Sequence, residues 1–182
     1  MDMMTRILAV LGLVAALTVL SGGTASACSC APLEPRQRMD LAAAVFSATA
    51  VDVRVDELVL KGGSVTATLR ADHVYKGKPG AEFEVTTDAQ GASCGYEFTR
   101  GGRYLVFAAT QDSELITTLC SGNRLLPAGD QPLRLSDRTQ GTEELTPELI
   151  SALGTPVRVS PVPRPPRTVP TWWSLWWWGR SW

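Results

Sequence analysis

The chain has 182 residues, and its 17 Lys and Arg nearly balance its 18 Asp and Glu, which gives a formal net charge of −1. This balance excludes the strongly basic surface typical of nucleic-acid-binding proteins, so we expect no nucleic-acid partner. The length and the 45% hydrophobic content suit one domain with a single core, accompanied by shorter accessory segments.

Residues 1–27 have the pattern of a secretory signal peptide. Arg6 precedes an apolar run over residues 7–20, and small residues then lead to Ala25-Ser26-Ala27. The run is shorter than the roughly 20 residues that a membrane-spanning helix needs, although an uncut leader that anchors the chain is the alternative. Cleavage after Ala27 would make Cys28 the first residue of a secreted, extracellular protein.

All four cysteines follow this leader. In an exported chain an even number of cysteines predicts disulfides, here two, with three connectivities open. A bond between Cys28 and Cys30 would close a very tight ring, so we expect each of them to pair with Cys94 or Cys120. Either arrangement closes long loops.

Two regions in the first half of the body alternate apolar and polar residues with the period of a strand. Residues 51–55 and 65–75 flank a turn at 61–63 that contains two glycines, which predicts a hairpin. After a second turn at Lys76-Gly77-Lys78-Pro79-Gly80, residues 82–87 alternate again, and Phe83 and Val85 are expected to face inward.

The second half of the body predicts two further strands. Residues 104–109 are apolar on both faces, as expected of a central strand, and residues 115–119 lead directly into Cys120. Five short strands joined by Gly-rich turns predict an all-β fold, a five-stranded OB-fold barrel.

One or two short helices are expected beside this barrel. Residues 35–41 suit a single short helix. A second helix is predicted to begin after the N-cap Thr146 and to end at Gly154, with Pro147 in its first turn. Its apolar residues would pack on the barrel: Leu149, Ile150 and Leu153.

The composition changes after Gly154, so we place the globular domain at residues 28–154. Residues 155–170 hold half of the twelve prolines and predict an extended linker, and residues 171–182 hold all six tryptophans. We expect the whole segment 155–182 to be disordered. Because Trp favours the lipid–water interface, the tail is also a candidate for membrane-surface contact. The alternative explanation for its tryptophans is a shifted reading frame that replaced an ordinary apolar tail.

Catalytic residues are sparse. His73 is the only histidine, no motif surrounds it, and we expect it on the surface or on one face of a strand. The sequence has neither a second histidine nor a Cys-x-x-Cys pair from which to build a zinc site, so we expect no metal site of the chain's own. We also expect no cofactor and no enzymatic activity. A redox role for Cys28-Ser29-Cys30 is disfavoured, because redox dithiols usually enclose two residues at a helix start.

Four short motifs in register resemble the tissue inhibitors of metalloproteinases, specifically their N-terminal, netrin-like domain. The motifs are Cys28-Ser29-Cys30-Ala31-Pro32, Val74-Tyr75-Lys76-Gly77, Ser93-Cys94-Gly95-Tyr96 and Ile116-Thr117-Thr118-Leu119-Cys120-Ser121. Together they cover most of residues 28–126. The resemblance implies an OB barrel and the disulfides Cys28–Cys94 and Cys30–Cys120.

The resemblance also implies a function, the inhibition of zinc metalloendopeptidases by a monomeric secreted protein. In that family the N-terminal α-amino nitrogen and carbonyl oxygen bind the protease zinc, a role that falls to Cys28. The implied protease-contacting residues are Ser29, which would enter the specificity pocket, and Cys30, Ala31, Pro32, Ala92 and Ser93. Two departures from the family bear on affinity and target range: residues 36–40 stand where a third-disulfide cysteine is expected, and the first hairpin is short.

Two alternatives remain open. Netrin-like modules also serve as binding domains without inhibitory activity. In addition, Ala25-Ser26-Ala27-Cys28 partly resembles a bacterial lipobox, although Leu is normally expected at Ala25. Lipidation would produce a cell-surface lipoprotein and would consume the thiol of Cys28.

Overall fold

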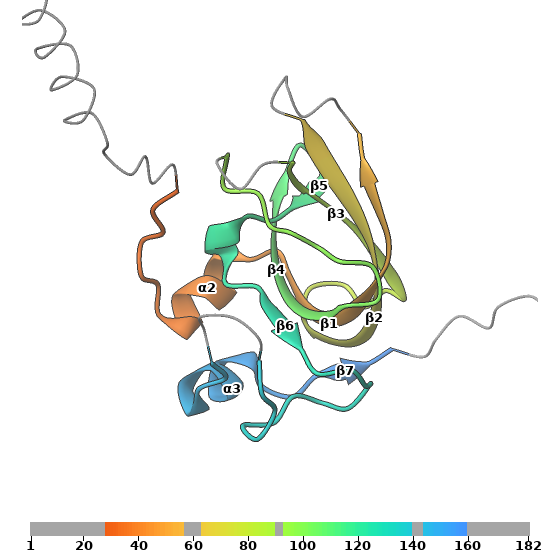
Figure 1. Ribbon diagram of the computed structural model, residues 1–182. Coiled ribbons are helices and arrows are strands. Elements are labelled where there is room, and N and C mark those ends of the chain that lie inside the picture. The colour runs from red at the N-terminus through yellow and green to blue at the C-terminus, as the bar shows by residue number, and fades with distance from the viewer. Residues whose placement is uncertain (1–27, 57–62, 90–92, 140–143, 160–182) are drawn as a thin grey trace, which may run out of the picture.

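The computed structural model describes residues 28–56, 63–89, 93–139 and 144–159. Five strands form a closed barrel (Figure 1): β1 (Ala44–Val55), β2 (Ser64–Lys76), β3 (Glu82–Asp88), β4 (Arg103–Gln111) and β5 (Glu114–Ile116). The neighbours run β1-β2-β3-β5-β4, and β4 pairs back with β1. The pair β3–β5 is parallel, whereas the other pairs of the barrel are antiparallel. The prediction of an all-β, OB-like barrel is confirmed.

The long strand β1 makes this closure possible because it pairs with β2 on one edge and with β4 on the other. Its register with β2 shifts at three places, between Val45 and Phe46, Ser47 and Ala48, and Ala50 and Asp52. Such irregularities bend a strand and increase its twist. The predicted hairpin of β1 and β2 is therefore present, with β1 beginning well before residue 51.

The barrel interior is filled by small residues around a few aromatic rings. Phe46 stacks on Phe83 with ring centroids 4.1 Å apart. Around this pair, Val85 and Leu69 are fully buried, as is a set of alanines on β1, β2 and β4: Ala48, Ala67 and Ala108. Small side chains suit a narrow barrel, where a larger residue would force strained packing. The inward orientation expected for Phe83 and Val85 is confirmed.

A second cluster lies outside the barrel, under the helices α2 (Pro35–Leu41) and α3 (Pro147–Leu153), on the same side in Figure 1. Outward-facing residues of β1 and β4 pack there against buried Leu149 and Leu153, with Ile150 at the margin. The N-cap Thr146 accepts a hydrogen bond from Leu149 N at 3.2 Å, as predicted. Both faces of β4 are covered, which agrees with its apolar run from Tyr104 to Ala109.

Three short elements differ from the sequence-based expectation. The fifth strand ends at Ile116 instead of residue 119, and a 3-10 helix, η3 (Leu119–Ser121), follows it. The chain then forms β6 (Arg124–Leu126), which pairs with β4. Finally, β7 (Val157–Arg158) pairs with β2, so residues 155–159 belong to the folded domain and not to a disordered linker. The linker was predicted from its proline content, which does not show that the backbone of β7 pairs with β2.

A buried ion pair between β2 and β4 joins the C-terminal part of the domain to the barrel. Asp72 accepts two hydrogen bonds at 2.9 Å from the guanidinium of Arg103, a side chain that is 5% exposed. Arg103 also donates to the carbonyl oxygen of Gln131 at 2.7 Å. His73 Nδ1 lies 2.9 Å from the same carboxylate, and His73 is 2% exposed. Of the two expected positions, on the surface or on one face of a strand, His73 takes the second: it lies in β2 and is buried, because β7 and the Asp72 network cover this part of the strand.

Candidate functional site

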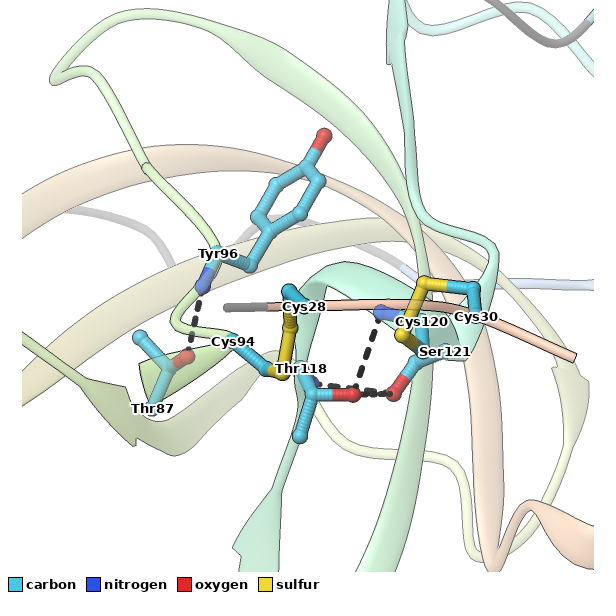
Figure 2. Close-up of a disulfide and its surroundings, with 8 residues drawn as sticks. All are labelled: Cys28, Cys30, Thr87, Cys94, Tyr96, Thr118, Cys120 and Ser121. Carbon is cyan, nitrogen blue, oxygen red and sulfur yellow. Dashed lines mark hydrogen bonds between the residues drawn. A yellow bond between two sulfur atoms is a disulfide. The ribbon is translucent and has the colours of Figure 1, made fainter. Parts of the chain in front are cut away.

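Two adjacent disulfides hold the N-terminal segment against the barrel (Figure 2). Cys28 is bonded to Cys94 and Cys30 to Cys120, with Cα–Cα distances of 5.5 and 5.1 Å. This is the pairing implied by the family resemblance. Because the bonds join residues 66 and 90 positions apart, they fix the segment beside two separate loops of the barrel.

The loop that carries Cys94 is held by the barrel itself. Tyr96 N donates to Thr87 Oγ1 on β3 at 2.8 Å, and Leu119 N donates to the carbonyl oxygen of Cys94 at 2.7 Å. The Tyr96 ring packs edge-on against Phe98, and burial raises the pKa of its hydroxyl to about 12. Cys94 has φ of 65°, a left-handed conformation that is uncommon for a non-glycine residue. These contacts determine the position of its side chain.

The loop that carries Cys120 is fixed by a local polar network. Thr118 caps η3, since its Oγ1 accepts a hydrogen bond from Cys120 N at 3.2 Å. Asn123 then ties the loop to β4: its Oδ1 accepts from Phe107 N and its Nδ2 donates to Thr117 Oγ1, both at 2.8 Å. The Thr117 hydroxyl in turn donates to the carbonyl oxygen of Phe107 at 2.8 Å. This network ends β5 early and redirects the chain into η3.

Helix α2 provides a further anchor for the N-terminal segment. Arg38 Nε donates to the carbonyl oxygen of Leu33 at 3.1 Å, so the helix holds the chain shortly after Cys30. The guanidinium of Arg38 also packs against Gly122, which has φ of +90° and leaves no room for a Cβ atom at that contact. Together with the disulfides, Arg38 makes residues 28–34 part of the folded unit.

The predicted contact residues form one exposed edge. Ser29, Cys30, Ala31 and Pro32 are exposed, whereas Cys28 is half-buried. Ser93 is exposed beside Cys94 and is thereby brought next to the N-terminal segment by the Cys28–Cys94 bond. Ala92 lies outside the described residues. The edge offers backbone groups and small side chains, a chemistry suited to binding.

Sequence reasoning missed a shallow apolar cavity beside this edge. Its volume is about 180 Å³, and Leu41, which is 67% exposed, stands at its margin. Other lining residues come from α2, β4 and η3: Leu33, Arg38, Ala42, Phe107, Ala109, Thr118, Cys120 and Ser121. Strand periodicity carries no signal for this cavity, because the cavity forms between elements far apart in the chain.

The disulfides indicate an oxidising and therefore extracytoplasmic environment. Within the described residues, no helix is both long and apolar enough to cross a membrane. Comparison with known proteins adds no assignment: no protein-family model matches the chain, and no curated protein matches it.

Proposed function

We propose that the mature protein is a secreted inhibitor of zinc metalloendopeptidases that binds the protease zinc through the α-amino nitrogen and the carbonyl oxygen of Cys28. The observation that carries the proposal is the pinning of this residue by the Cys28–Cys94 bond beside exposed Ser29 and Ser93. The resemblance of four motifs to the tissue inhibitors of metalloproteinases supports the same conclusion.

The chemistry required is simple. A catalytic zinc is held by three protein ligands and keeps a position for water or substrate. A free amine and the adjacent carbonyl can occupy that coordination space as a five-membered chelate, displacing the attacking water. Ser29 would then extend into the specificity pocket, and residues 30–32 would follow the substrate groove. The inhibitor has no scissile bond to present in this arrangement.

Rigidity of the edge favours tight binding. Ordering a flexible side chain on association costs about 0.5–1.5 kcal/mol, and ordering of backbone costs more. Here the cost is already met on folding, because the disulfides and the Arg38–Leu33 hydrogen bond fix residues 28–34. The barrel therefore acts as a support for a short, preorganised binding segment.

The test compares the mature protein that begins at Cys28 with a variant that carries one additional N-terminal Ala. The extension converts the α-amino group of Cys28 into a peptide nitrogen, which cannot bind the zinc. The Ki against a susceptible zinc endopeptidase should therefore rise by at least ~100-fold, or about 2.7 kcal/mol. A Glu148→Gln variant with the native N-terminus, changed at an exposed position of α3 outside the predicted contact residues, serves as the matched control and should retain the inhibition. Equal inhibition by the extended protein would refute chelation by Cys28.

A non-inhibitory netrin-like binding module is the alternative outcome. It is favoured if the disulfide-intact protein with a free Cys28 amine fails against a panel of zinc endopeptidases. The third possibility, a lipoprotein, is identified by intact-mass measurement. Lipidation of Cys28 adds the mass of acyl chains and precludes the Cys28–Cys94 bond.

A further inference from the structure

The apolar cavity between α2 and η3 adjoins the exposed edge formed by the predicted contact residues, here called the N-terminal edge. Leu33 lines the cavity and directly follows residues 28–32 of this edge. Cys120, another lining residue, is bonded to exposed Cys30, and Figure 2 shows this bond next to Ser121, which also lines the cavity. In Figure 1 the N-terminal segment runs directly into α2. A partner that covers the N-terminal edge therefore also reaches the cavity.

We propose that this cavity receives one aromatic side chain of the target protease, from the rim of the groove that holds residues 30–32. The inference rests on the proposed inhibition of zinc endopeptidases and adds to it a contact that sets affinity and target choice. The cavity volume of about 180 Å³ suits a single ring, since an apolar cavity of about 150 Å³ holds benzene. Arg38 lines the same cavity, and guanidinium groups are attracted to aromatic faces.

The N-terminal edge alone is too small for a stable complex. It consists of residues 28–32 with Ala92 and Ser93, whereas a specific protein–protein interface involves about 20–30 residues and about 800 Å² on each side. Its side chains are also small, so the edge lacks the large buried anchor on which most of the binding energy of an interface depends. The protease must therefore cover neighbouring surface, and the cavity is apolar surface directly continuous with the edge.

Two large apolar side chains flank the cavity and are open to solvent. Leu41, at the end of α2, is 67% exposed, and Leu119, on η3 beside the lining residue Cys120, is 49% exposed. Hydroxyl groups of Thr118 and Ser121 lie among this apolar surface. A concave apolar site with a few polar groups and exposed apolar neighbours is typical of a binding site. The part of the chain that the structure describes leaves this site uncovered.

The walls of the cavity are fixed before a partner binds. Strand β4 contributes Phe107, which is 2% exposed. On the side of α2, Arg38 Nε donates to the carbonyl oxygen of Leu33 at 3.1 Å. On the side of η3, Thr118 N donates to Ser121 Oγ at 2.9 Å. Because a preorganised site loses little conformational entropy on association, burial of a ring in this cavity contributes almost fully to affinity.

The first measurement is the Ki of three variants against a purified zinc endopeptidase that the native protein inhibits. Leu41→Ala removes most of a contacting side chain and should raise the Ki about tenfold. Ala109→Phe places a ring inside the cavity and should raise the Ki by at least as much. Val157→Ala is the matched control, because Val157 is 52% exposed on β7 and outside the cavity; its Ki should equal the native value. The Tm of each variant is measured in parallel, and Leu41→Ala decides the result if Ala109→Phe unfolds.

A photo-crosslinking side chain at position 41 identifies what occupies the cavity. In the purified complex we expect a cross-link to an aromatic residue beside the active-site groove of the protease. Replacement of that residue by Ala should weaken binding, and together with Leu41→Ala it should raise the Ki by less than the product of the two separate effects. A cross-link to a charged residue of the protease or to a second copy of this chain, or two independent effects, would overturn the proposal.

The same measurements separate this proposal from the inhibitory mechanism on which it rests. If Leu41→Ala and Ala109→Phe inhibit as the native protein does, while acetylation of the Cys28 amine abolishes inhibition, the cavity proposal fails and chelation stands. If the acetylated protein inhibits fully and Leu41→Ala is about tenfold weaker, chelation fails and the cavity contact stands. A native protein that inhibits no zinc endopeptidase would overturn both.

Discussion

Removal of one disulfide at a time gives a quantitative test of how the N-terminal segment is fixed. Considered alone, the Cys28–Cys94 and Cys30–Cys120 bonds close loops of 66 and 90 residues, and the chain-entropy model assigns them about 4.4 and about 4.6 kcal/mol. The loops overlap, however. With one bond in place, the ends of the other are already joined through the 2-residue step from Cys28 to Cys30 and the 26-residue step from Cys94 to Cys120.

Each bond therefore closes an effective loop of only about 28 residues when the other is present, worth about 3.6 kcal/mol. We predict that replacing either pair by Ser lowers the free energy of unfolding by this amount. Replacing both pairs should lower it by about 8 kcal/mol, which exceeds the sum of the two single effects by about 1 kcal/mol.

Urea unfolding of the four proteins, followed by circular dichroism, supplies the comparison. The two single-bond variants should be equally stable although their sequence separations differ. A loss below about 1 kcal/mol for either bond, or a double replacement that costs less than the sum of the single ones, would refute the entropic reasoning. The variant that lacks only Cys30–Cys120 should in addition inhibit proteases more weakly, since Cys28 remains tethered but residues 30–32 are released.

Three further predictions concern the amine, the buried ion pair and a glycine. Inhibition should weaken about tenfold per unit as the pH falls below 7, because the Cys28 amine, with an ordinary pKa near 8, must lose its proton to bind zinc; a Ki that is constant from pH 7.5 to 5.5 would contradict this. Asp72→Ala should cost about 3–5 kcal/mol in urea unfolding by leaving a buried guanidinium unpaired, whereas Arg70→Ala, at an exposed pair, should cost less than about 1 kcal/mol. Gly122→Ala should lower the Tm more than Gly101→Ala, because both have positive φ but only Gly122 faces a side chain; equal shifts would exclude the contact as the cause.

The barrel was predictable because its strands carry local signals. The alternation over residues 65–71, with Ala67, Leu69 and Ala71 buried, identifies both a strand and its inner face. The apolar run at 104–109 identifies the strand that is covered on both sides. The Thr146–Pro147 start of α3 is equally local, since the cap and the proline act within one helical turn.

The features that fix the site were less visible because they depend on contacts between distant residues. Asn123 ends β5 and supports η3 by bonding to Phe107 and Thr117, and nothing in its own neighbourhood predicts those partners. The same is true of Arg38, whose contacts with Leu33 and Gly122 hold the N-terminal segment. The string Thr117-Thr118-Leu119-Cys120-Ser121 was the one available signal, since clustered hydroxyl residues often form local caps.

The central claim is that the amine and carbonyl of Cys28 coordinate the zinc of a target protease, and a cobalt-substituted endopeptidase tests it most directly. Titration with the disulfide-intact protein that begins at Cys28 should change the visible spectrum of the bound cobalt and saturate at one equivalent. The same protein with an acetylated N-terminus should leave the spectrum unchanged. Full inhibition by the native protein with no change in the cobalt spectrum would contradict the claim.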